Sequence, residues 1–224
     1  MLCPLCKHHP LELVHTETKG TLIGREFWRC EECQLISVPP AFQIDDAAEQ
    51  AIYDLHQNDP QDPHYRQFLS RIAVPLLNLL PASAQGLDFG SGPGPTLSLM
   101  LEDAGHSCAV YDKFYAADES VWDHHYDFIT ATEVFEHLTD PAIVLDRLLS
   151  CLKPSGYLAL MTQRWISLAR FQNWQYRNDA THIIFMHEYT CDWLARTYSL
   201  TIEYMAHGVV IFRKTGEPVE KPVV

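Results

Sequence analysis

The sequence has no long hydrophobic run and no export signal. None of its apolar stretches approaches the roughly 18 residues that a membrane-spanning helix needs. The N-terminus begins with cysteines and lacks the charged and then apolar pattern of a signal peptide. These absences predict a globular cytoplasmic protein with no membrane partner. The 224 residues, 47% of them apolar, suffice for one full core and one small accessory unit.

Basic residues are scarce in the part of the chain where acidic residues are dense. Residues 41–140 hold 17 Asp and Glu against 3 Lys and Arg, and the whole chain has a net charge of −13. An acidic surface repels phosphate backbones, so the charge disfavours a large RNA or DNA substrate. The simplest interpretation of the excess is a solvated acidic surface.

Four of the seven cysteines form two C-x-x-C pairs, Cys3 with Cys6 and Cys30 with Cys33. Each pair can offer two thiolates to one tetrahedral ion, and the pattern resembles a zinc ribbon with a hairpin between the pairs. Because all four ligands would be cysteines, no position is left for a reactive water, so we expect a structural zinc ion. Disulfides are the weaker alternative, since nothing suggests secretion.

The most informative motif is a glycine loop at residues 86–95. An apolar stretch runs into Asp88, glycines follow at positions 90, 92 and 94, and Pro95 opens a predicted helix. Alternate glycines let the backbone turn sharply and approach a ligand, and the helix start offers free N–H groups. A dinucleotide-binding G-x-G-x-x-G motif would need glycine in place of Pro95, so a nicotinamide cofactor is disfavoured.

This loop resembles the first motif of the class I S-adenosylmethionine-dependent methyltransferases. Three later segments follow in the family's order: Asp112 at the end of the next apolar run, residues 126–141, and residues 152–160. In that family an acid in the place of Asp112 holds the two ribose hydroxyls. The resemblance implies S-adenosylmethionine as cofactor, with contacts from Asp88, Gly90, Ser91, Gly92, Gly94, Asp112, Lys113, Phe114, Thr132 and Glu133.

The resemblance and the alternation of strand and helix patterns predict an α/β fold. We expect a doubly wound, mainly parallel sheet with a C-terminal antiparallel hairpin at 201–214, plus the small N-terminal zinc ribbon. Strands are expected near 85–89, 107–111, 126–131, 157–161, 201–205 and 209–214, and helices near 43–57, 64–80, 95–104, 141–151 and 190–198. Only 14 residues separate Asp112 from Asp127, so one edge of the sheet should be shorter than is usual in the family.

The predicted domain boundaries follow from these elements. They are a zinc-ribbon-like unit at 1–40, a helix and linker at 41–63, a Rossmann-like methyltransferase domain at 64–215 and a flexible tail at 216–224.

Residues after the predicted strand at 157–161 should face the acceptor of the methyl group. His137 and His182 can titrate near neutral pH and are the candidate acid-base residues, although His137 has an equally good structural interpretation. Arginines and aromatic residues alternate in the same stretch, which suits a carboxylate, a phosphate or a planar ring. The candidate substrate-binding residues are Arg164, Trp174, Tyr176 and Arg177.

Three functions remain open at this point. The first is methyl transfer to a small anionic or aromatic acceptor, and the second is an RNA base methyltransferase that grips its substrate with the ribbon and the arginines. Residues 1–40 hold four Lys and Arg against five acids, which offers no basic stripe for RNA. The third is a binding module that has lost turnover. No motif assigns the acceptor or the oligomeric state.

Overall fold

The larger of two sheets carries the predicted α/β fold. The computed structural model describes residues 1–55 and 59–216. Six strands pair in the order β10-β11-β7-β6-β4-β5. The central strands β5, β4, β6 and β7 are parallel, and β11 and β10 complete the sheet as an antiparallel hairpin. Their bounds are β4 Gln85–Phe89, β5 Ser107–Tyr111, β6 Tyr126–Thr132, β7 Leu152–Met161, β10 Leu200–Ala206 and β11 Val209–Lys214.

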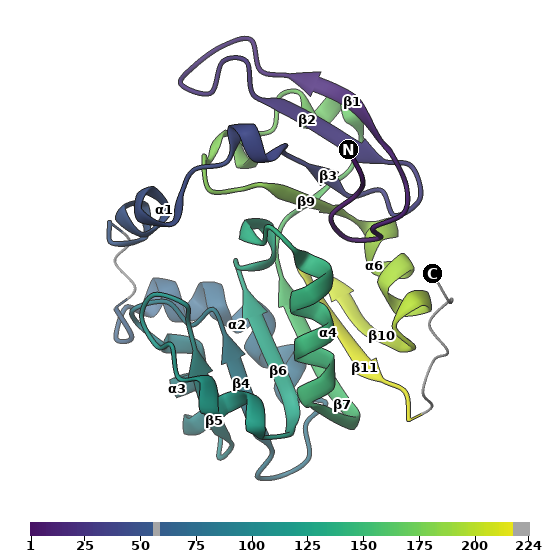
Figure 1. Cartoon of the computed structure of the whole chain (residues 1–224). Coiled ribbons are helices and arrows are strands. Elements are labelled where there is room, and N and C mark those ends of the chain that lie inside the picture. Colours follow the sequence, from purple (N-terminus) through teal and green to yellow (C-terminus); the bar gives the residue numbers. More distant parts are fainter. Residues whose placement is uncertain (56–58, 217–224) are drawn as a thin grey trace.

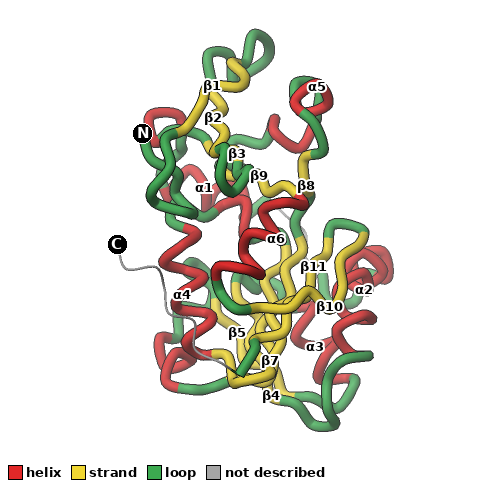
Figure 2. The backbone as a smooth tube through the Cα atoms, turned by 90° about the vertical axis from the view of Figure 1, so that its right-hand side faces the viewer, coloured by secondary structure: helices red, strands yellow, loops and turns green. Residues whose placement is uncertain are grey.

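Helices cover both faces of this sheet, as Figures 1 and 2 show from two directions. Helices α2 (Pro63–Leu77) and α3 (Thr96–Asp103) lie on one face, and α4 (Pro141–Cys151) and α6 (Glu188–Thr197) lie on the other. An aspartate before a proline starts both α2 and α4, because the carboxylate accepts an N–H of the first turn and proline fits the first helical position. The predicted fold class is confirmed.

The shortened edge of the sheet is also confirmed. Between β5 and β6 the chain forms only the 3-10 helix η2 (Glu119–Asp123), and β5 is the edge strand in the described part of the chain.

Pro75 lies in the last turn of α2, which ends at Leu77. The acidic helix predicted at 43–57 is α1 (Asp46–Tyr53), and the predicted tail falls, from residue 217 onward, outside the described residues. Among those residues, no helix has the length and apolarity to cross a membrane.

A second, smaller sheet lies above the carboxyl ends of the parallel strands (Figure 1). Its order is β1-β2-β3-β9-β8, with β1 Leu11–Thr16, β2 Glu26–Cys30, β3 Ile36–Ser37, β8 Arg164–Trp165 and β9 Ile184–His187. The first two strands form the hairpin expected of a zinc ribbon. The last two come from the stretch between β7 and α6, and β3 pairs with β9 through Ile36 opposite Phe185. We call this sheet the upper sheet and the six-stranded one the lower sheet.

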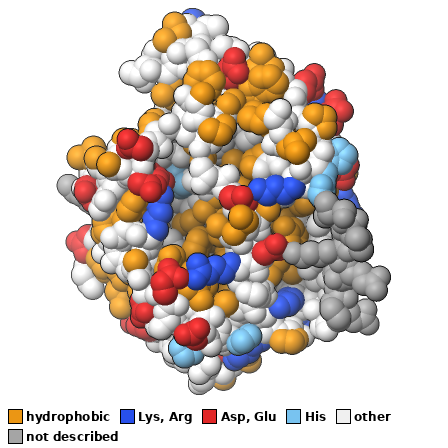
Figure 3. All heavy atoms as spheres, viewed as in Figure 1, with side chains coloured by type: hydrophobic (Ala, Val, Ile, Leu, Met, Phe, Trp, Pro, Cys, Tyr) orange, Lys and Arg blue, Asp and Glu red, His pale blue; other side chains and the backbone are white. Residues whose placement is uncertain are grey.

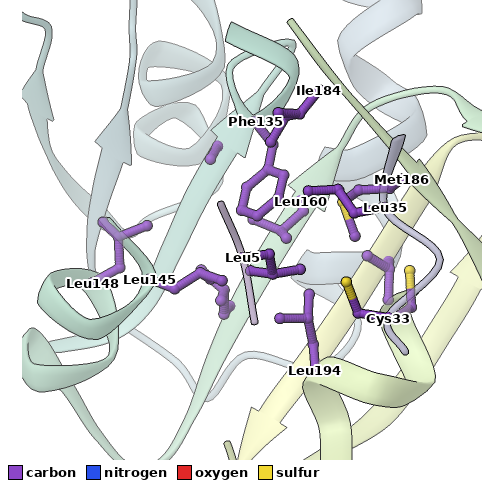
Figure 4. Packing of buried hydrophobic residues seen from close by; sticks show 14 of the residues in the cluster. Leu5, Cys33, Leu35, Phe135, Leu145, Leu148, Leu160, Ile184, Met186 and Leu194 are labelled. Carbon is purple, nitrogen blue, oxygen red and sulfur yellow. The ribbon is translucent and has the colours of Figure 1, made fainter. Parts of the chain in front are cut away.

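One apolar core joins the two sheets. Leu5, Cys33 and Leu35 of the N-terminal segment belong to the same buried cluster as Phe135, which follows β6, and Leu160 of β7. Figure 4 shows these side chains together with Leu145, Leu148, Ile184, Met186 and Leu194. The N-terminal unit is therefore held by packing and by backbone hydrogen bonds to β9, and not by a linker alone.

Candidate active site

A cavity of about 590 Å³ lies between the two sheets, at the carboxyl ends of β4, β5 and β6. This is the edge of a parallel sheet at which α/β proteins bind ligands. In the space-filling view hydrophobic side chains gather around the hollow, with acidic and basic side chains at its rim (Figure 3). The lining includes eight of the predicted cofactor residues and both predicted acid-base residues: Gly90, Ser91, Gly92, Asp112, Lys113, Phe114, Thr132, Glu133, His137 and His182.

The glycine loop needs glycine for a steric reason. Gly90 has a φ of +75°, and a Cβ atom placed on it would lie 2.3 Å from a methyl carbon of Val134. Gly92 has a φ of +65°, which also lies in the left-handed region. The backbone N–H of Gly90 donates to the carbonyl oxygen of Tyr111 at 2.7 Å, which fixes the loop against the end of β5. The loop can therefore approach a ligand closely.

Asp112 ties this loop to the segment that follows β5. One carboxylate oxygen accepts the N–H of Gly92 at 2.9 Å, and the other accepts the N–H groups of Phe114 at 2.8 Å and Tyr115 at 3.1 Å. The carboxylate also lines the cavity. Since each carboxylate oxygen can accept more than one hydrogen bond, Asp112 retains capacity for ligand hydroxyls.

Asp88 and Gly94 lie behind this wall and do not line the main cavity. The side chain of Asp88 is buried, and its carboxylate accepts the hydroxyl of Thr130 at 2.6 Å. Burial, with a smaller contribution from the negative charge of Asp112, raises the pKa of Asp88 to about 7.

Helix α1 closes one side of the cavity through Lys113. The Lys113 ammonium lies 2.5 Å from a carboxylate oxygen of Glu49 and 3.1 Å from one of Asp46. It also lies 4.4 Å from the centre of the Phe114 ring. The two residues after Asp112 are thus held against α1, and Phe114 presents an aromatic face at the cavity wall.

The turn after β6 places two polar groups at the cavity wall. Glu133 has a φ of +52°, which is unfavourable for a residue other than glycine, and its N–H donates to Met161 O at 2.7 Å. Burial and the nearby charge of Glu136 raise the pKa of Glu133 to about 8. Next to it, the buried hydroxyl oxygen of Thr132 has no hydrogen-bond partner within the described part of the chain. Thr132 therefore has capacity for a ligand.

The two histidines, 45 residues apart in the sequence, meet at the opposite wall. Their ring centroids are 4.9 Å apart. Nδ1 of His137 lies 3.0 Å from Thr181 O, and Nδ1 of His182 lies 2.7 Å from Tyr176 O. Burial lowers the pKa of both side chains, that of His182 to about 4. Both imidazoles are therefore neutral at physiological pH.

The four residues predicted to bind the acceptor do not line the cavity. Arg177 is buried, forms an ion pair with Glu17 and donates to the carbonyl oxygen of Phe171. Trp174 packs in the aromatic cluster of the upper sheet, and Arg164 lies on β8. Tyr176 lies behind the cavity wall, where its hydroxyl contacts the carboxylates of Glu133 and Glu136.

No pattern in the sequence indicates the role of a further residue, Arg25, which supports the cavity wall that carries His182. This side chain is only 2% exposed. Its guanidinium donates to three carbonyl oxygens of one loop: Asp179 at 2.8 Å, Ala180 at 3.2 Å and His182 at 2.6 Å. The N-terminal segment thus holds the loop that carries His182. The partners lie more than 150 residues away in the chain, so no local pattern could show this contact.

The four paired cysteines gather in the upper part of the molecule. Cys3 Sγ lies 3.5 Å from Cys33 Sγ, and Cys6 Sγ lies 3.6 Å from Cys30 Sγ. All four sulfur atoms lie within 4.8 Å of one another. Zinc–sulfur bonds of about 2.3 Å place the sulfurs of a tetrahedral site roughly 3.8 Å apart, so this donor set fits a zinc ion.

Both cysteine pairs also use the same turn. The residue after the second cysteine, Lys7 or Gln34, has a positive φ and donates its N–H to the carbonyl of the first cysteine at 3.0 Å.

Comparisons with known proteins agree with this architecture. A sequence profile described as a methyltransferase domain matches residues 61–204, which is more than half of the chain. The chain therefore belongs to this methyltransferase domain family. No curated protein matches the sequence at a significant level.

Two solved structures share the fold. The first is the 1,6-didemethyltoxoflavin N1-methyltransferase of Burkholderia thailandensis with 1,6-didemethyltoxoflavin and S-adenosylhomocysteine bound. It is 16% identical, with a TM-score of 0.52 over 81% of this chain and 96% of that one. The second is the magnesium protoporphyrin IX methyltransferase of Synechocystis PCC 6803 with bound S-adenosylhomocysteine. It is 14% identical, with a TM-score of 0.53 over 75% of this chain and 94% of that one.

Proposed function

We propose that this protein transfers the methyl group of S-adenosylmethionine to a small acceptor bound in the same cavity. The observation that carries the proposal is the lining of that cavity. The glycine loop and Asp112 form one wall, and two neutral histidines form the other. A volume of about 590 Å³ is in the range of small-molecule sites. Both neighbours named above hold S-adenosylhomocysteine, which supports the cofactor class.

Each wall has a separate task in this proposal. The sulfonium methyl is already activated, so the protein must align it with the nucleophile and exclude water. Asp112 accepts the ribose hydroxyls, and Gly90 and Gly92 admit the backbone to close contact. Thr132 and Glu133 face the methionine end, where Thr132 has unused hydrogen-bonding capacity. The carboxylates around the cavity favour a cationic cofactor over its neutral product.

The acceptor wall favours a small aromatic molecule. The centre of the Tyr53 ring lies 5.4 Å from that of His137, and Tyr65 and Phe68 line other parts of the same cavity, so all three offer flat apolar contacts. A neutral His137 or His182 can receive a proton from the acceptor. Of the arginines that would favour an anionic acceptor or RNA, Arg177 is already paired with Glu17. The RNA alternative therefore gains no support from the cavity.

We also propose that a structural zinc ion is held by Cys3, Cys6, Cys30 and Cys33. The close approach of the four sulfur atoms, all of them buried, supports this assignment. The ion would join the two ends of the β1–β2 hairpin, and it would stabilise the segment that carries Arg25.

Calorimetric titration with S-adenosylhomocysteine tests the cofactor assignment. We expect the wild type to bind it, and Asp112→Asn to weaken binding by about 10- to 100-fold, since a hydrogen bond to a charged group is worth about 1.5–3 kcal/mol and the loop loses an anchor. Asp123→Asn, an exposed aspartate near the same segment, is the matched control and should bind as the wild type does.

Absence of binding by the folded wild type would contradict the proposal, and so would equal binding by Asp112→Asn. Turnover of S-adenosylmethionine in the presence of hydroxy-aromatic and amino-aromatic compounds then tests the acceptor class.

A further inference from the structure

Three potential metal ligands meet at the acceptor wall, apart from the four cysteines. Glu136, His137 and His182 each offer one ligand atom, and these atoms lie within 4.8 Å of one another. Glu136 and His137 belong to the 3-10 helix η3 (Phe135–His137), and His182 belongs to the loop before β9. The N–H of Ile183 donates to Glu136 O at 2.8 Å, so backbone pairing holds the two segments together.

The hydrogen bonds of the two histidines leave Nε2 of each ring free to bind a metal. A carbonyl oxygen can only accept, so the Nδ1 atoms that face Thr181 O and Tyr176 O carry the ring protons. In these neutral tautomers the lone pair belongs to Nε2. Metal-binding histidines are usually oriented in this way, with the second ring nitrogen donating to a carbonyl or a carboxylate.

The side chain of Glu136 gives a second, independent indication of a bound cation. Glu136 is only 1% exposed, and its Oε1 accepts a hydrogen bond from the Tyr176 hydroxyl. Its Oε2 is buried and has no hydrogen-bond partner within the described residues. A buried carboxylate oxygen without a donor is costly, and a bound cation would remove that cost.

We propose that Glu136, His137 and His182 bind a divalent transition-metal ion at the acceptor wall of the cavity. Two imidazoles and one carboxylate are a donor set that suits Zn²⁺ and related ions and leaves coordination positions open. Bonds of about 2.1 Å hold tetrahedral ligands roughly 3.4 Å apart, so the side chains would close slightly around the ion. A carboxylate oxygen of Asp179 lies 3.9 Å from His182 Nε2 and forms part of the surroundings.

Both histidines line the cavity, so the open coordination positions of the ion would face its interior. A hydroxyl or carboxylate oxygen of the acceptor would bind there and be oriented towards the methyl donor. With both Nε2 atoms on the ion neither histidine accepts a proton, and a hydroxyl acceptor would instead lose its proton to solvent when it coordinates the ion. This second step rests on the proposed function, whereas the metal site does not.

Metal content distinguishes the two sites. After loading with Zn²⁺ and removal of loosely bound metal, elemental analysis of the wild type should give two ions per chain. Glu136→Gln and His182→Asn should each retain one, because the four cysteines are untouched. Exposed His125→Gln is the matched control and should retain two. Glu136→Gln keeps the shape of the side chain and so separates loss of the ligand from loss of packing.

Cobalt spectroscopy identifies the ligands. Co²⁺ added to protein that holds one tightly bound Zn²⁺ should give visible absorption without the thiolate charge-transfer bands of a cysteine site, and Glu136→Gln should abolish it. A single ion per folded wild-type chain that Glu136→Gln retains, or cobalt absorption unchanged in Glu136→Gln, would overturn the proposal. Titration with S-adenosylhomocysteine reports on the cofactor separately, so a failed cofactor assignment does not alter the metal count.

Discussion

The lower wall of the cavity is made by loops that each directly follow a parallel strand, whereas the upper wall joins segments from distant parts of the chain through contacts between them. The glycine loop, Asp112 and Glu133 come directly after β4, β5 and β6. The upper wall combines Tyr53, the η3 helix and the loop that carries His182. Arg25, from the other end of the chain, holds that loop.

This difference should separate cofactor binding from binding of the acceptor. The lower wall is positioned by local backbone geometry, so changes there should affect cofactor binding. The upper wall is positioned by long-range contacts, so changes there should affect the acceptor side first. The shared core nevertheless predicts that the two walls unfold together. The following predictions test this comparison.

Loss of the proposed zinc site should have the largest effect. In Cys33→Ser the ion loses a ligand, and because Leu5 and Leu35 share a core with Phe135, we expect the whole chain to melt in one transition. The melting temperature should fall by more than about 10 °C, which corresponds to a few kcal/mol for a chain of this size. Scanning calorimetry measures it, with Cys108→Ala as a buried cysteine control that should lose only a few degrees. Two separate transitions would show that the walls are independent folding units.

Substitution in the glycine loop should affect the lower wall alone. Gly90→Ala combines an unfavourable φ with a steric clash against Val134, and we expect at least a tenfold loss of affinity for S-adenosylhomocysteine, or about 1.4 kcal/mol. Gly105→Ala is the matched control, because Gly105 has a φ of +92° and no atom within 4 Å of an added Cβ. It should lose only about 1 kcal/mol of stability and keep its affinity. Similar binding by both variants would contradict the steric argument.

Substitution of Arg25 should affect the upper wall alone. Arg25→Met leaves three carbonyl oxygens without their donor, and we expect a loss of about 2–4 kcal/mol of stability. Hydrogen exchange should accelerate in the loop at 179–182, whereas the affinity for S-adenosylhomocysteine should change less than about threefold, or roughly 0.6 kcal/mol. Arg29→Met, which removes a partly exposed ion pair with Glu12, is the control for the same hairpin. Unchanged exchange in Arg25→Met would show that the loop is held by other contacts.

The smallest expected effect is on the pH dependence of stability and of cofactor binding, through the carboxyl group of Asp88. Its raised pKa of about 7 means that the folded protein holds this proton more tightly than the unfolded chain does. The carboxyl therefore lowers the stability of the cofactor-free protein as the pH rises from about 4 to about 7. If Asp88 holds the amino group of the cofactor, affinity for S-adenosylhomocysteine should weaken as the pH falls below about 7. Asp88→Asn should bind more weakly and lose this part of the pH dependence, which calorimetry at several pH values measures. An identical pH profile in the variant would assign the dependence to another group.

The sequence predicted the lower wall better than the upper wall for a physical reason. Asp88, the glycines and Asp112 act through turns and strand ends that a few neighbouring residues specify, and the strand bounds at 85–89 and 107–111 agree with the structure. The stretch from Arg164 to Arg177 is different, because it contacts the N-terminal segment: Arg177 pairs with Glu17, and Trp165 donates to the carbonyl oxygen of Gln34. These contacts join residues far apart in the sequence, so composition alone could not show that Arg177 faces Glu17 and not the cavity.

The pairing of β3 with β9 also determines when this protein can finish folding. Both cysteine pairs precede Ile36 in the chain, but Ile36 meets Phe185 only after all of the residues between them have been synthesised. At about 5–20 residues per second, the interval is roughly 7–30 seconds. During that time β3 presents an unpaired strand edge beside the hydrophobic side chain of Leu35, which can pair with another nascent chain. Expression at a lower temperature, or with added chaperone, should therefore raise the soluble yield by protecting this one edge.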